Sequence, residues 1–424
     1  MHRVLRGIFY ISSRKSEPCL HMLKIGLIKE GKRPIDRRVP LTPTQAKYIN
    51  EHYPELQIVA QSSIVRSFAD SEYRDLGVTL TEDVDDCDVL MGVKEVPLDE
   101  LIADKTYFFF SHTIKKQAYN RKLLQTILQK NIRLIDYEKL TNSRGERVVA
   151  FGRWAGIVGA YNALWTWGRR NGSFDLRRAN ECFDYEDLKK EYNKVALPPI
   201  KIVVTGGGRV AKGALEVLHD ANIHQVSPED ILNNDYDEPV FAQLNSRHYN
   251  KRRKGGAFQA QEFYSQPSEY DSDFAKYARV ADMLIACAYW SPEAPVLFSK
   301  EEAQKADFKI KVVADITCDI EGSIPSTKKA STISEPIYDY NPKSGDIETP
   351  LNSMENITVM AIDNLPCELP RDASQAFGQD LMQHVIPYLA TTDSDEMLKR
   401  ATIAENGKLT EDYAYLQNYV DGKE

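Results

Sequence analysis

The sequence predicts an α/β protein with two Rossmann-like domains, in each of which a parallel sheet is flanked by helices. Three observations support this fold class. Short apolar runs alternate with helical stretches in the first third of the chain, the same alternation recurs after residue 200, and a glycine-rich turn there separates an apolar run from an amphipathic helix. Strands that alternate with helices form parallel sheets covered on both faces. A chain of 424 residues is long enough for about two or three domains.

Hydrophobic periodicity locates the individual elements. In the first unit, the expected strands are 23–28, 57–60, 89–93, 107–110 and 132–135, and the expected helices are 42–51 and 118–129. In the second unit, the expected strands are 200–204, 223–226, 283–288, 311–316 and 357–362, and the expected helices are 155–169, the stretch from Ala214, 371–390 and a last helix after Thr410. Thr42 and Thr44 are candidate caps of the first helix. The polar stretch 233–272 is long for a loop, which predicts a functional insertion or local helices.

The most specific local motif is the turn Gly206-x-Gly208-x-x-Ala211. Its glycines let backbone amides approach a pyrophosphate at the start of the following helix. The turn follows an apolar run and precedes a helical pattern, which is the order that dinucleotide binding needs. A merely structural turn is the alternative. The expected cofactor contacts are Gly206, Gly207, Gly208, Arg209, Val210 and Ala211.

The residues after the second strand of such a unit indicate which dinucleotide binds. NAD enzymes place an acid there for the ribose 2′-hydroxyl, whereas a nearby arginine suits a 2′-phosphate. With 223–226 as that strand, the next position is Ser227, and the nearest acid is Glu229. Arg209, Arg247 and Lys212 are the candidate phosphate ligands. NADP(H) is therefore the favoured cofactor, while NAD(H) stays open because Glu229 can still reach the ribose.

A second set of polar residues stands at predicted strand ends. Lys94 and His112 each follow a strand of the first unit, and Asp363 follows the last strand of the second. Sites in α/β proteins gather at the carboxyl ends of strands. A lysine–histidine pair transfers protons near neutral pH if burial lowers the lysine pKa. The alternatives are a solvated lysine, a core histidine, and an aspartate that caps a helix.

Arginine and glutamate side chains complete the candidate site. Guanidinium groups bind carboxylates bidentately, which makes Arg38, Arg147 and Arg153 candidate substrate ligands. Glu95 and Glu138 either tune the charge of the lysine or form surface ion pairs. Position in the sequence alone does not choose between these roles.

The overall composition narrows the class of protein. A net charge of −8 argues against general binding to nucleic acid or to a membrane surface. No apolar run approaches the ~20 residues of a bilayer-crossing helix. The 6 cysteines form no C-x-x-C pair, so no metal site or disulfide framework is expected. Residues 1–21 have a weak likeness to a transit peptide, but an N-terminal extension of a cytoplasmic protein is the favoured interpretation.

Several motifs in one order resemble the saccharopine dehydrogenases (L-lysine-forming), and most closely the lysine–ketoglutarate reductase half of α-aminoadipic semialdehyde synthase. This family belongs to the alanine dehydrogenase and transhydrogenase superfamily. The matching stretches are 37–43, 92–94, 109–115, 134–138, 149–156, 205–214 and 362–366. The resemblance spans nearly the whole chain, from Met22 to Tyr419, and several motifs in one order are far more specific than any one of them.

The resemblance implies a reversible reductive condensation, in which L-lysine and 2-oxoglutarate form an imine that NAD(P)H reduces to saccharopine. Proton transfers to the carbinolamine and the nitrogen suit a lysine and a histidine. The implied substrate-site residues are Lys94 and His112 as the acid–base pair, Arg38 and Arg147 as carboxylate ligands, Glu95 and Glu138 as acids that tune the lysine, and Phe151 as a further contact.

The resemblance also implies a domain plan. Residues 22–152 and 364–424 would form a discontinuous substrate domain, and 153–363 would form the dinucleotide domain inserted between them. The saccharopine-cleaving domain that follows the reductase half in bifunctional relatives has no counterpart here, so we expect a monofunctional enzyme. Its expected partners are small-molecule substrates, and it is either a monomer or a homodimer.

Two other functions compete with this one. An alanine dehydrogenase-like amino-acid dehydrogenase shares the two-domain plan and the lysine–histidine pair, and differs in turning over pyruvate and ammonia. A catalytically silent nucleotide-binding module is the other alternative. It would bind cofactor without turnover, and substitution of Lys94 or His112 would leave that binding unchanged.

Overall fold

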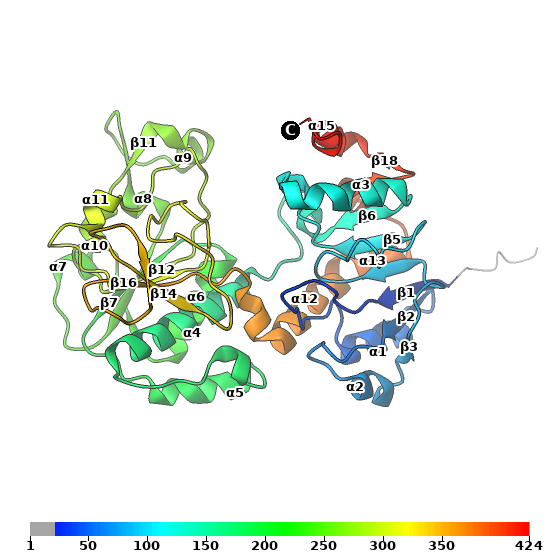
Figure 1. Ribbon diagram of the computed structural model, residues 1–424, viewed down its shortest axis with the longest axis horizontal. Coiled ribbons are helices and arrows are strands. Elements are labelled where there is room, and N and C mark those ends of the chain that lie inside the picture. The colour runs from blue at the N-terminus through cyan, green and yellow to red at the C-terminus, as the bar shows by residue number, and fades with distance from the viewer. Residues whose placement is uncertain (1–21, 424) are drawn as a thin grey trace, which may run out of the picture.

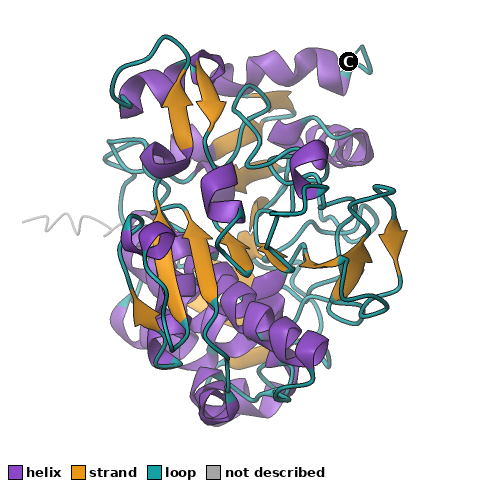
Figure 2. Ribbon diagram, turned by 90° about the vertical axis from the view of Figure 1, so that its left-hand side faces the viewer, coloured by secondary structure: helices purple, strands orange, loops and turns teal. Residues whose placement is uncertain are grey.

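The computed structural model describes residues 22–423, so the expected N-terminal extension 1–21 lies outside the described residues. Figure 1 shows two lobes side by side, with helix α12 (Pro370–His384) between them. Each lobe is built on a sheet of 8 strands. Figure 2, which looks onto the second lobe, shows helices and loops packed around the strands. The predicted α/β class with two Rossmann-like domains is confirmed.

The sheet of the first lobe has the order β18-β17-β6-β5-β4-β1-β2-β3. Its strands are β1 (Leu23–Leu27), β2 (Leu56–Gln61), β3 (Thr79–Thr81), β4 (Val89–Met91), β5 (Thr106–Phe109), β6 (Arg133–Asp136), β17 (Thr402–Glu405) and β18 (Lys408–Leu409). The strands β1 to β6 are parallel, whereas β17 runs antiparallel to β6. The strands expected in this unit are all present, and the short edge strand β3 is an addition to them. Because β17 joins this sheet, the end of the chain completes the lobe that its beginning started.

The helices of the first lobe enclose that sheet. They are α1 (Pro43–His52), α2 (Asp70–Asp75), α3 (Arg121–Gln129), α13 (Ile386–Ala390), α14 (Met397–Ala401) and α15 (Gln417–Val420), with the 3₁₀ turns η1 (Thr113–Lys115), η2 (Ala118–Asn120), η3 (Tyr137–Lys139) and η8 (Glu411–Leu416). Thr42 caps α1 as the sequence predicts, because its hydroxyl accepts a hydrogen bond from the Gln45 amide. Two apolar clusters, one containing Ile58 and Phe377 and the other Leu90 and Leu124, make up the core of this lobe.

The sheet of the second lobe has the order β15-β14-β16-β13-β12-β7-β9-β8. Its strands are β7 (Lys201–Thr205), β8 (His224–Gln225), β9 (Val240–Leu244), β12 (Met283–Ala286), β13 (Val312–Asp315), β14 (Ile337–Tyr340), β15 (Ile347–Glu348) and β16 (Ile357–Met360). Six of them, β8, β9, β7, β12, β13 and β16, form a parallel series, and β14 adds an antiparallel strand. A separate hairpin pairs β10 (Asn250–Arg252) with β11 (Tyr270–Ser272).

The helices of the second lobe are of very different lengths. They are α4 (Gly152–Asn171), α5 (Tyr185–Lys189), α6 (Arg209–Asp220), α7 (Asp230–Asn233), α8 (Ser246–Tyr249), α9 (Ala260–Ser265), α10 (Ala275–Ala278) and α11 (Lys300–Ala303), with the 3₁₀ turns η4 (Ala179–Glu181), η5 (Lys190–Lys194), η6 (Pro267–Glu269) and η7 (Leu365–Glu368). The two longest, α4 and α6, cross closely, because Gly156 and Gly213 let the two backbones touch. A Cβ at Gly213 would overlap the Arg153 carbonyl.

One strand assignment from the sequence is wrong. The sequence predicts 223–226 as the second strand, beside the strand that leads into the glycine turn. In the structure β8 is an edge strand of 2 residues, and the strand beside β7 is β9, which lies inside the polar stretch 233–272. Local helices predicted for that stretch are present. The error has a physical cause, since the order of strands in a sheet is set by non-local pairing.

Two features connect the lobes. Phe151 packs partly against the core of each lobe. Helix α12 does the same, because Ala373 belongs to the core of the second lobe and Phe377 to that of the first. Among the described helices, none is long and apolar enough to cross a membrane.

Candidate active site

The glycine turn lies between β7 and α6, at the carboxyl edge of the second sheet. Gly206 has a φ of +102°, and a Cβ there would lie 3.1 Å from the Ala288 nitrogen. A Cβ on Gly207 would lie 2.8 Å from the Asn245 side-chain oxygen, while the space beside Gly208 is open. The turn that leads into α6 therefore has no Cβ atoms to cover its backbone amides, and helix N-termini attract phosphates. This cradle fits the pyrophosphate of a dinucleotide.

The residues around the turn differ in exposure. Arg209 is exposed, Val210 is half-buried and Ala211 is fully buried against the core. The Arg209 side chain donates a hydrogen bond from Nη2 to the carbonyl oxygen of Arg147 in the first lobe. The start of α6 therefore touches the chain segment that carries a predicted substrate residue. Asn364, just beyond β16, accepts a hydrogen bond from Arg38 of the first lobe, so the carboxyl edge of the second sheet lies against the site residues of the first.

The position expected to hold the ribose 2′ group is corrected by the order of strands. Since β9 neighbours β7, the residue that follows the second strand is Asn245, and Arg247 lies two positions further on. Ser227 follows the edge strand β8 instead, and its hydroxyl hydrogen-bonds to Asp230. The reason for assigning Ser227 to the cofactor is thereby removed. The corrected position holds Asn245 and no acid, so the argument for a 2′-phosphate survives, with Arg247 still a candidate ligand.

Asp363 lies just beyond β16, at the same carboxyl edge as the glycine turn, and its side chain is exposed. Asp315, at the end of β13, is fully buried and is held by hydrogen bonds from Thr317 and Thr327. Burial raises the pKa of Asp315. Of these two aspartates, only Asp363 is accessible to a ligand, and its contact with a cofactor stays a prediction.

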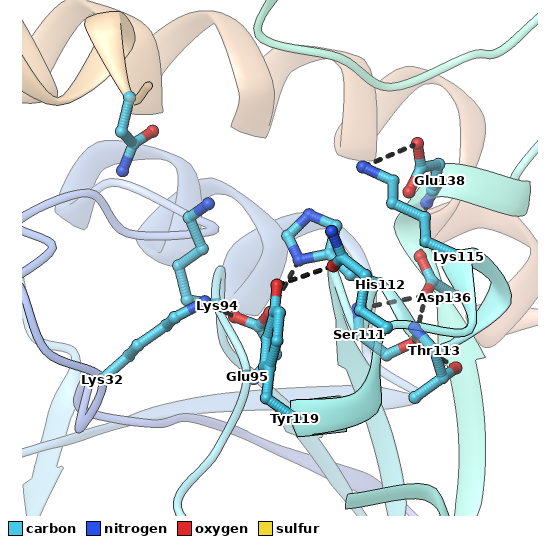
Figure 3. A network of polar contacts seen from close by, with 12 residues as sticks. Lys32, Lys94, Glu95, Ser111, His112, Thr113, Lys115, Tyr119, Asp136 and Glu138 are labelled. Atoms are coloured by element: carbon cyan, nitrogen blue, oxygen red, sulfur yellow. Dashed lines mark hydrogen bonds and ion pairs between the residues drawn. The ribbon is translucent and has the colours of Figure 1, made fainter. Parts of the chain in front are cut away.

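Lys94 and His112 are brought together at the carboxyl edge of the first sheet. They follow the adjacent parallel strands β4 and β5, and Figure 3 shows both side chains rising from this edge into the same space. His112 has a φ of +53°, a left-handed conformation that turns the chain at the end of β5. The loop is held by Asp136, which is fully buried and accepts hydrogen bonds from the amide and hydroxyl of Ser111.

The His112 ring is oriented by Glu95. Its Nδ1 lies 2.6 Å from Glu95 Oε1, and the other carboxylate oxygen of Glu95 lies 2.5 Å from Lys32 Nζ. Burial raises the pKa of Glu95, but hydrogen bonds from His112 and Lys32 outweigh that effect and hold the pKa at about 2. A charged acceptor at Nδ1 assigns the hydrogen to Nδ1 and leaves Nε2 as the basic nitrogen. Glu95 thus contacts the histidine rather than the lysine.

Lys94 has a pKa lowered by burial and, secondarily, by the positive charge of Arg38. Its backbone amide donates to Glu30 Oε2 at 2.9 Å, and the Val93 amide donates to Glu30 Oε1 at 2.5 Å. Burial and the nearby Asp36 carboxylate raise the pKa of Glu30 to about 8. Sequence reasoning missed Glu30, although it follows the strand β1 and the strand-end rule that found Lys94 also applies to it.

Arg38 is buried and makes several contacts within the protein, which the sequence did not suggest. It is 2% exposed, and its Nη2 and Nε donate to Asp36 at 2.6 and 3.1 Å. Nη2 also lies 3.2 Å from Asn364, and the guanidinium stands 4.1 Å above the Phe151 ring. This pairing holds the pKa of Asp36 below its usual range despite burial. Arg38 therefore builds the floor of the site, and Nη1 is the donor that these contacts leave over for a substrate.

Arg147 is the more accessible arginine. Its side chain is 39% exposed, and its Nη1 lies 3.8 Å from Glu138 Oε1. Lys115 Nζ lies 3.9 Å from the same oxygen. Arg147 Nε and Glu138 Oε2 are both buried with no hydrogen-bond partner in the described part of the chain. Glu138 thus lies with cations other than Lys94, and the exposed part of the Arg147 side chain is accessible to a bound carboxylate.

Two further predicted residues have defined places. Phe151 stacks on Phe377 with ring centroids 4.5 Å apart, under Arg38, so it is an apolar part of the site floor. Arg153, the third candidate arginine, forms a bidentate ion pair with Glu216 at 3.0 and 2.6 Å between α4 and α6. Arg153 therefore stabilises the helix crossing. Among residues 22–423, no group of three or more His, Cys, Asp and Glu side chains is arranged to hold a metal ion.

A glycine turn in one lobe that faces a lysine and a histidine in the other defines a two-lobed α/β protein of the dinucleotide-binding class. Residues 26–158 match the N-terminal domain of alanine dehydrogenase/PNT, and residues 192–412 match its C-terminal domain. These matches cover most of the chain. The protein belongs to the alanine dehydrogenase/PNT family.

Relatives with curated names agree with the resemblance seen in the sequence. The chain is 31% identical to the mitochondrial α-aminoadipic semialdehyde synthase of Rattus norvegicus, across 95% of this chain and 48% of that protein. It is 28% identical to saccharopine dehydrogenase [NAD(+), L-lysine-forming] of Emericella nidulans, across 86% of this chain and 91% of that protein. The chain spans about half the length of the semialdehyde synthases that it matches.

Solved structures support the fold alone. An L-alanine dehydrogenase superposes with a TM-score of 0.62 at 16% identity, and covers 94% of this chain and 99% of its own. A transhydrogenase from Sinorhizobium meliloti superposes with a TM-score of 0.57 at 15% identity, across 91% and 98% of the two chains. Both have the same two-lobed architecture at identities too low to speak to substrates.

Proposed function

We propose that this protein is an NAD(P)-dependent saccharopine dehydrogenase of the L-lysine-forming type, which joins L-lysine to 2-oxoglutarate by reductive condensation. The observation that carries the proposal is the acid–base pair: Lys94 with a lowered pKa beside His112, whose Nδ1 is held by Glu95. The pair lies at the sheet edge that faces the glycine turn. The names of the rat and Emericella relatives supply the substrate class.

The reaction balances with the groups present. The ε-amine of lysine adds to the ketone, the carbinolamine loses water to an imine, and one hydride and one proton reduce the imine to a secondary amine. A bound nicotinamide nucleotide supplies the hydride. Lys94 and the Nε2 of His112 accept and return protons during addition and water loss. Burial lowers the pKa of Lys94 and so favours the uncharged amine, which is the form that accepts a proton.

Cationic side chains meet the substrate carboxylates. The Arg147 side chain is 39% exposed, and Lys115 lies beside Glu138, the same glutamate that Arg147 approaches. Arg38 adds Nη1 from the floor of the site. An arginine suits a carboxylate better than a lysine does, because its donors are arranged as a planar fork.

NADP(H) is the favoured cofactor of this proposal. Asn245 stands where an NAD enzyme has an acid, and Arg247 follows it. The adenosine ribose would lie at the end of β9, and Asp363 would lie near the nicotinamide at the same edge. The name of the Emericella relative specifies NAD(+), so the two nucleotides are compared directly in the test.

The test is an assay of NADPH and NADH oxidation with lysine plus 2-oxoglutarate. We expect turnover with this pair and a loss of at least about 100-fold in Lys94→Met and His112→Gln, with nucleotide affinity retained. Turnover with pyruvate plus ammonia, and none with lysine plus 2-oxoglutarate, would assign an alanine dehydrogenase-like function. Nucleotide binding without turnover of either pair would indicate a silent binding module.

A further inference from the structure

Asp136 connects two turns at the carboxyl edge of the first sheet. It is the last residue of β6, it pairs with Phe109 of the adjacent strand β5, and it is fully buried. Its Oδ2 accepts hydrogen bonds from the Ser111 amide, at 3.0 Å, and from the Ser111 hydroxyl. Its Oδ1 accepts from the Glu138 amide at 2.7 Å and so caps the turn η3. One carboxylate therefore holds together the turn after β5 and the turn after β6 (Figure 3).

The turn after β5 carries His112 in a backbone conformation that needs support. His112 has a φ of 53° and a ψ of 11°, and this left-handed conformation costs free energy for a residue with a Cβ. The Ser111 hydroxyl, which donates to Asp136, also lies 2.8 Å from Thr113 Oγ1 and accepts from the Thr113 amide at 3.3 Å. Ser111 and Thr113 are both fully buried. The contacts of Asp136 therefore fix the residues on either side of the histidine.

The turn after β6 carries Glu138, which lies among the cations proposed to meet substrate carboxylates. Glu138 Oε1 lies 3.8 Å from Arg147 Nη1 and 3.9 Å from Lys115 Nζ. Lys115 belongs to η1, which begins directly after His112. The two turns are therefore linked twice, by the buried carboxylate of Asp136 and by the more exposed contact between Lys115 and Glu138.

A buried carboxylate that accepts three hydrogen bonds can also serve folding alone, since buried polar groups are normally satisfied in this way. The positions of the two turns favour a role in the site. One turn bears the histidine of the acid–base pair, and the other bears a glutamate in contact with two cations of the site.

We propose that Asp136 is a positioning residue of the active site, which acts through Ser111 on His112 and through the turn η3 on Glu138. It keeps the group that transfers protons and the groups that bind the substrate carboxylate in one geometry. The inference rests on the proposed function, because that function assigns these two roles to the two turns.

The experiment compares two variants of the full chain with wild type. Ser111→Ala removes the hydroxyl that links Asp136 to Thr113 and leaves the bond from the Glu138 amide in place. Asp136→Ala releases both turns. Ser111→Ala is the milder change and carries the test if Asp136→Ala does not fold, which thermal unfolding of each variant shows.

The two variants should differ in their kinetics with lysine and 2-oxoglutarate. We expect Ser111→Ala to lower kcat about tenfold and to leave the KM for 2-oxoglutarate within about twofold, because only the His112 turn is released. Asp136→Ala should lower kcat at least as much and raise that KM about tenfold, because the Glu138 turn is released as well. Thr402→Ala is the control, since it removes a buried hydroxyl of the same lobe that donates to the Leu398 carbonyl.

A second readout does not depend on turnover. The hydrogen bond of 2.6 Å to Glu95 should shift the Nδ1 proton of His112 far downfield in the proton NMR spectrum, and His112→Gln identifies the signal. We expect Ser111→Ala to lose this signal, because the ring leaves Glu95 when the backbone of His112 relaxes. Thr402→Ala should retain it.

Two outcomes separate the inference from the proposed function. If Ser111→Ala and Asp136→Ala are less stable than wild type but keep its kcat, its KM and the His112 signal, Asp136 serves folding alone and the inference is wrong. If wild type does not turn over lysine with 2-oxoglutarate while Ser111→Ala still loses the His112 signal, the proposed function falls and the positioning of His112 by Asp136 stands.

Discussion

Glu95 Oε1 lies 2.6 Å from His112 Nδ1, and this contact makes Nε2 the basic nitrogen of the site. The two residues come from the ends of adjacent parallel strands, β4 and β5. Lys32 binds the second oxygen of Glu95, so the carboxylate is held from both sides. Glu95 therefore has two roles: it accepts the hydrogen bond that orients the His112 ring, and it places a negative charge beside that ring.

Substitution of Glu95 tests the two roles. Glu95→Gln keeps an acceptor for Nδ1–H and removes the charge that stabilises the imidazolium formed during proton transfer. We expect Glu95→Gln to lower kcat/KM with lysine and 2-oxoglutarate about tenfold. Glu95→Ala should lower it further, because the orientation of the His112 ring is also lost. Asp86→Asn, in an exposed pair with Lys24, is the control. Equal activity of Glu95→Gln and wild type would contradict the role of the charge.

Glu30 should make stability depend on pH. Its pKa is raised to about 8 in the folded chain, above the ordinary value of 4.5. The folded state therefore keeps a proton that the unfolded state releases, and its free energy of unfolding falls as pH rises from 4.5 to 8. Glu30→Gln lacks this titration. We expect the stability of the variant relative to wild type to rise across that range, measured by urea unfolding at each pH.

A constant difference between the two proteins from pH 4.5 to 8 would refute the titration of Glu30. The measurement compares the free energies of unfolding of variant and wild type at each pH. The two proteins share all other ionisable groups, so the pH dependence that those groups cause largely cancels in the difference. The Glu30→Gln variant retains one acceptor oxygen, so the amide of either Val93 or Lys94 loses its partner. The loss of stability from that source does not vary with pH and is therefore separable from the titration.

Arg147 should act on substrate binding. Its Nε is buried without a partner in the described chain, and its side chain is 39% exposed, so removal costs little folding energy. We expect Arg147→Ala to raise the KM for the oxo acid substrate by about tenfold or more and Arg147→Lys to recover part of that loss. Arg144→Ala is the matched control, since Arg144 is 78% exposed. An unchanged KM in Arg147→Ala would remove Arg147 from the substrate site.

Gly213 should matter for stability through the crossing of α4 and α6. A methyl group there overlaps the Arg153 carbonyl, which belongs to backbone and cannot rotate away. We expect Gly213→Ala to lower the free energy of unfolding by about 1–3 kcal/mol, despite the better helix propensity of alanine. Lys212→Ala, an exposed change in the same helix, should stay within about 0.5 kcal/mol. Chemical denaturation checks both, and a stabilised Gly213→Ala would show that the helices can separate at no cost.

Local pattern was enough to predict much of the fold. The strands β1, β2, β4 to β7, β12, β13 and β16 carry apolar runs of the right length, and α1 carries its own cap at Thr42. The glycine turn was also predictable, because its conformation depends on residues adjacent in sequence. The strand-end rule placed Lys94 and His112 at one edge, since neighbouring parallel strands end together.

Other features depend on which segments meet. The sequence by itself determined that a glycine turn, a lysine and a histidine stand at strand ends. Only the tertiary structure decided that β9 rather than β8 lies beside the turn, that Glu95 holds His112, and that Asp36 engages Arg38. The reason is physical: strand order and ion pairing are set by contacts between distant segments, and the local chain does not encode which partner it will find.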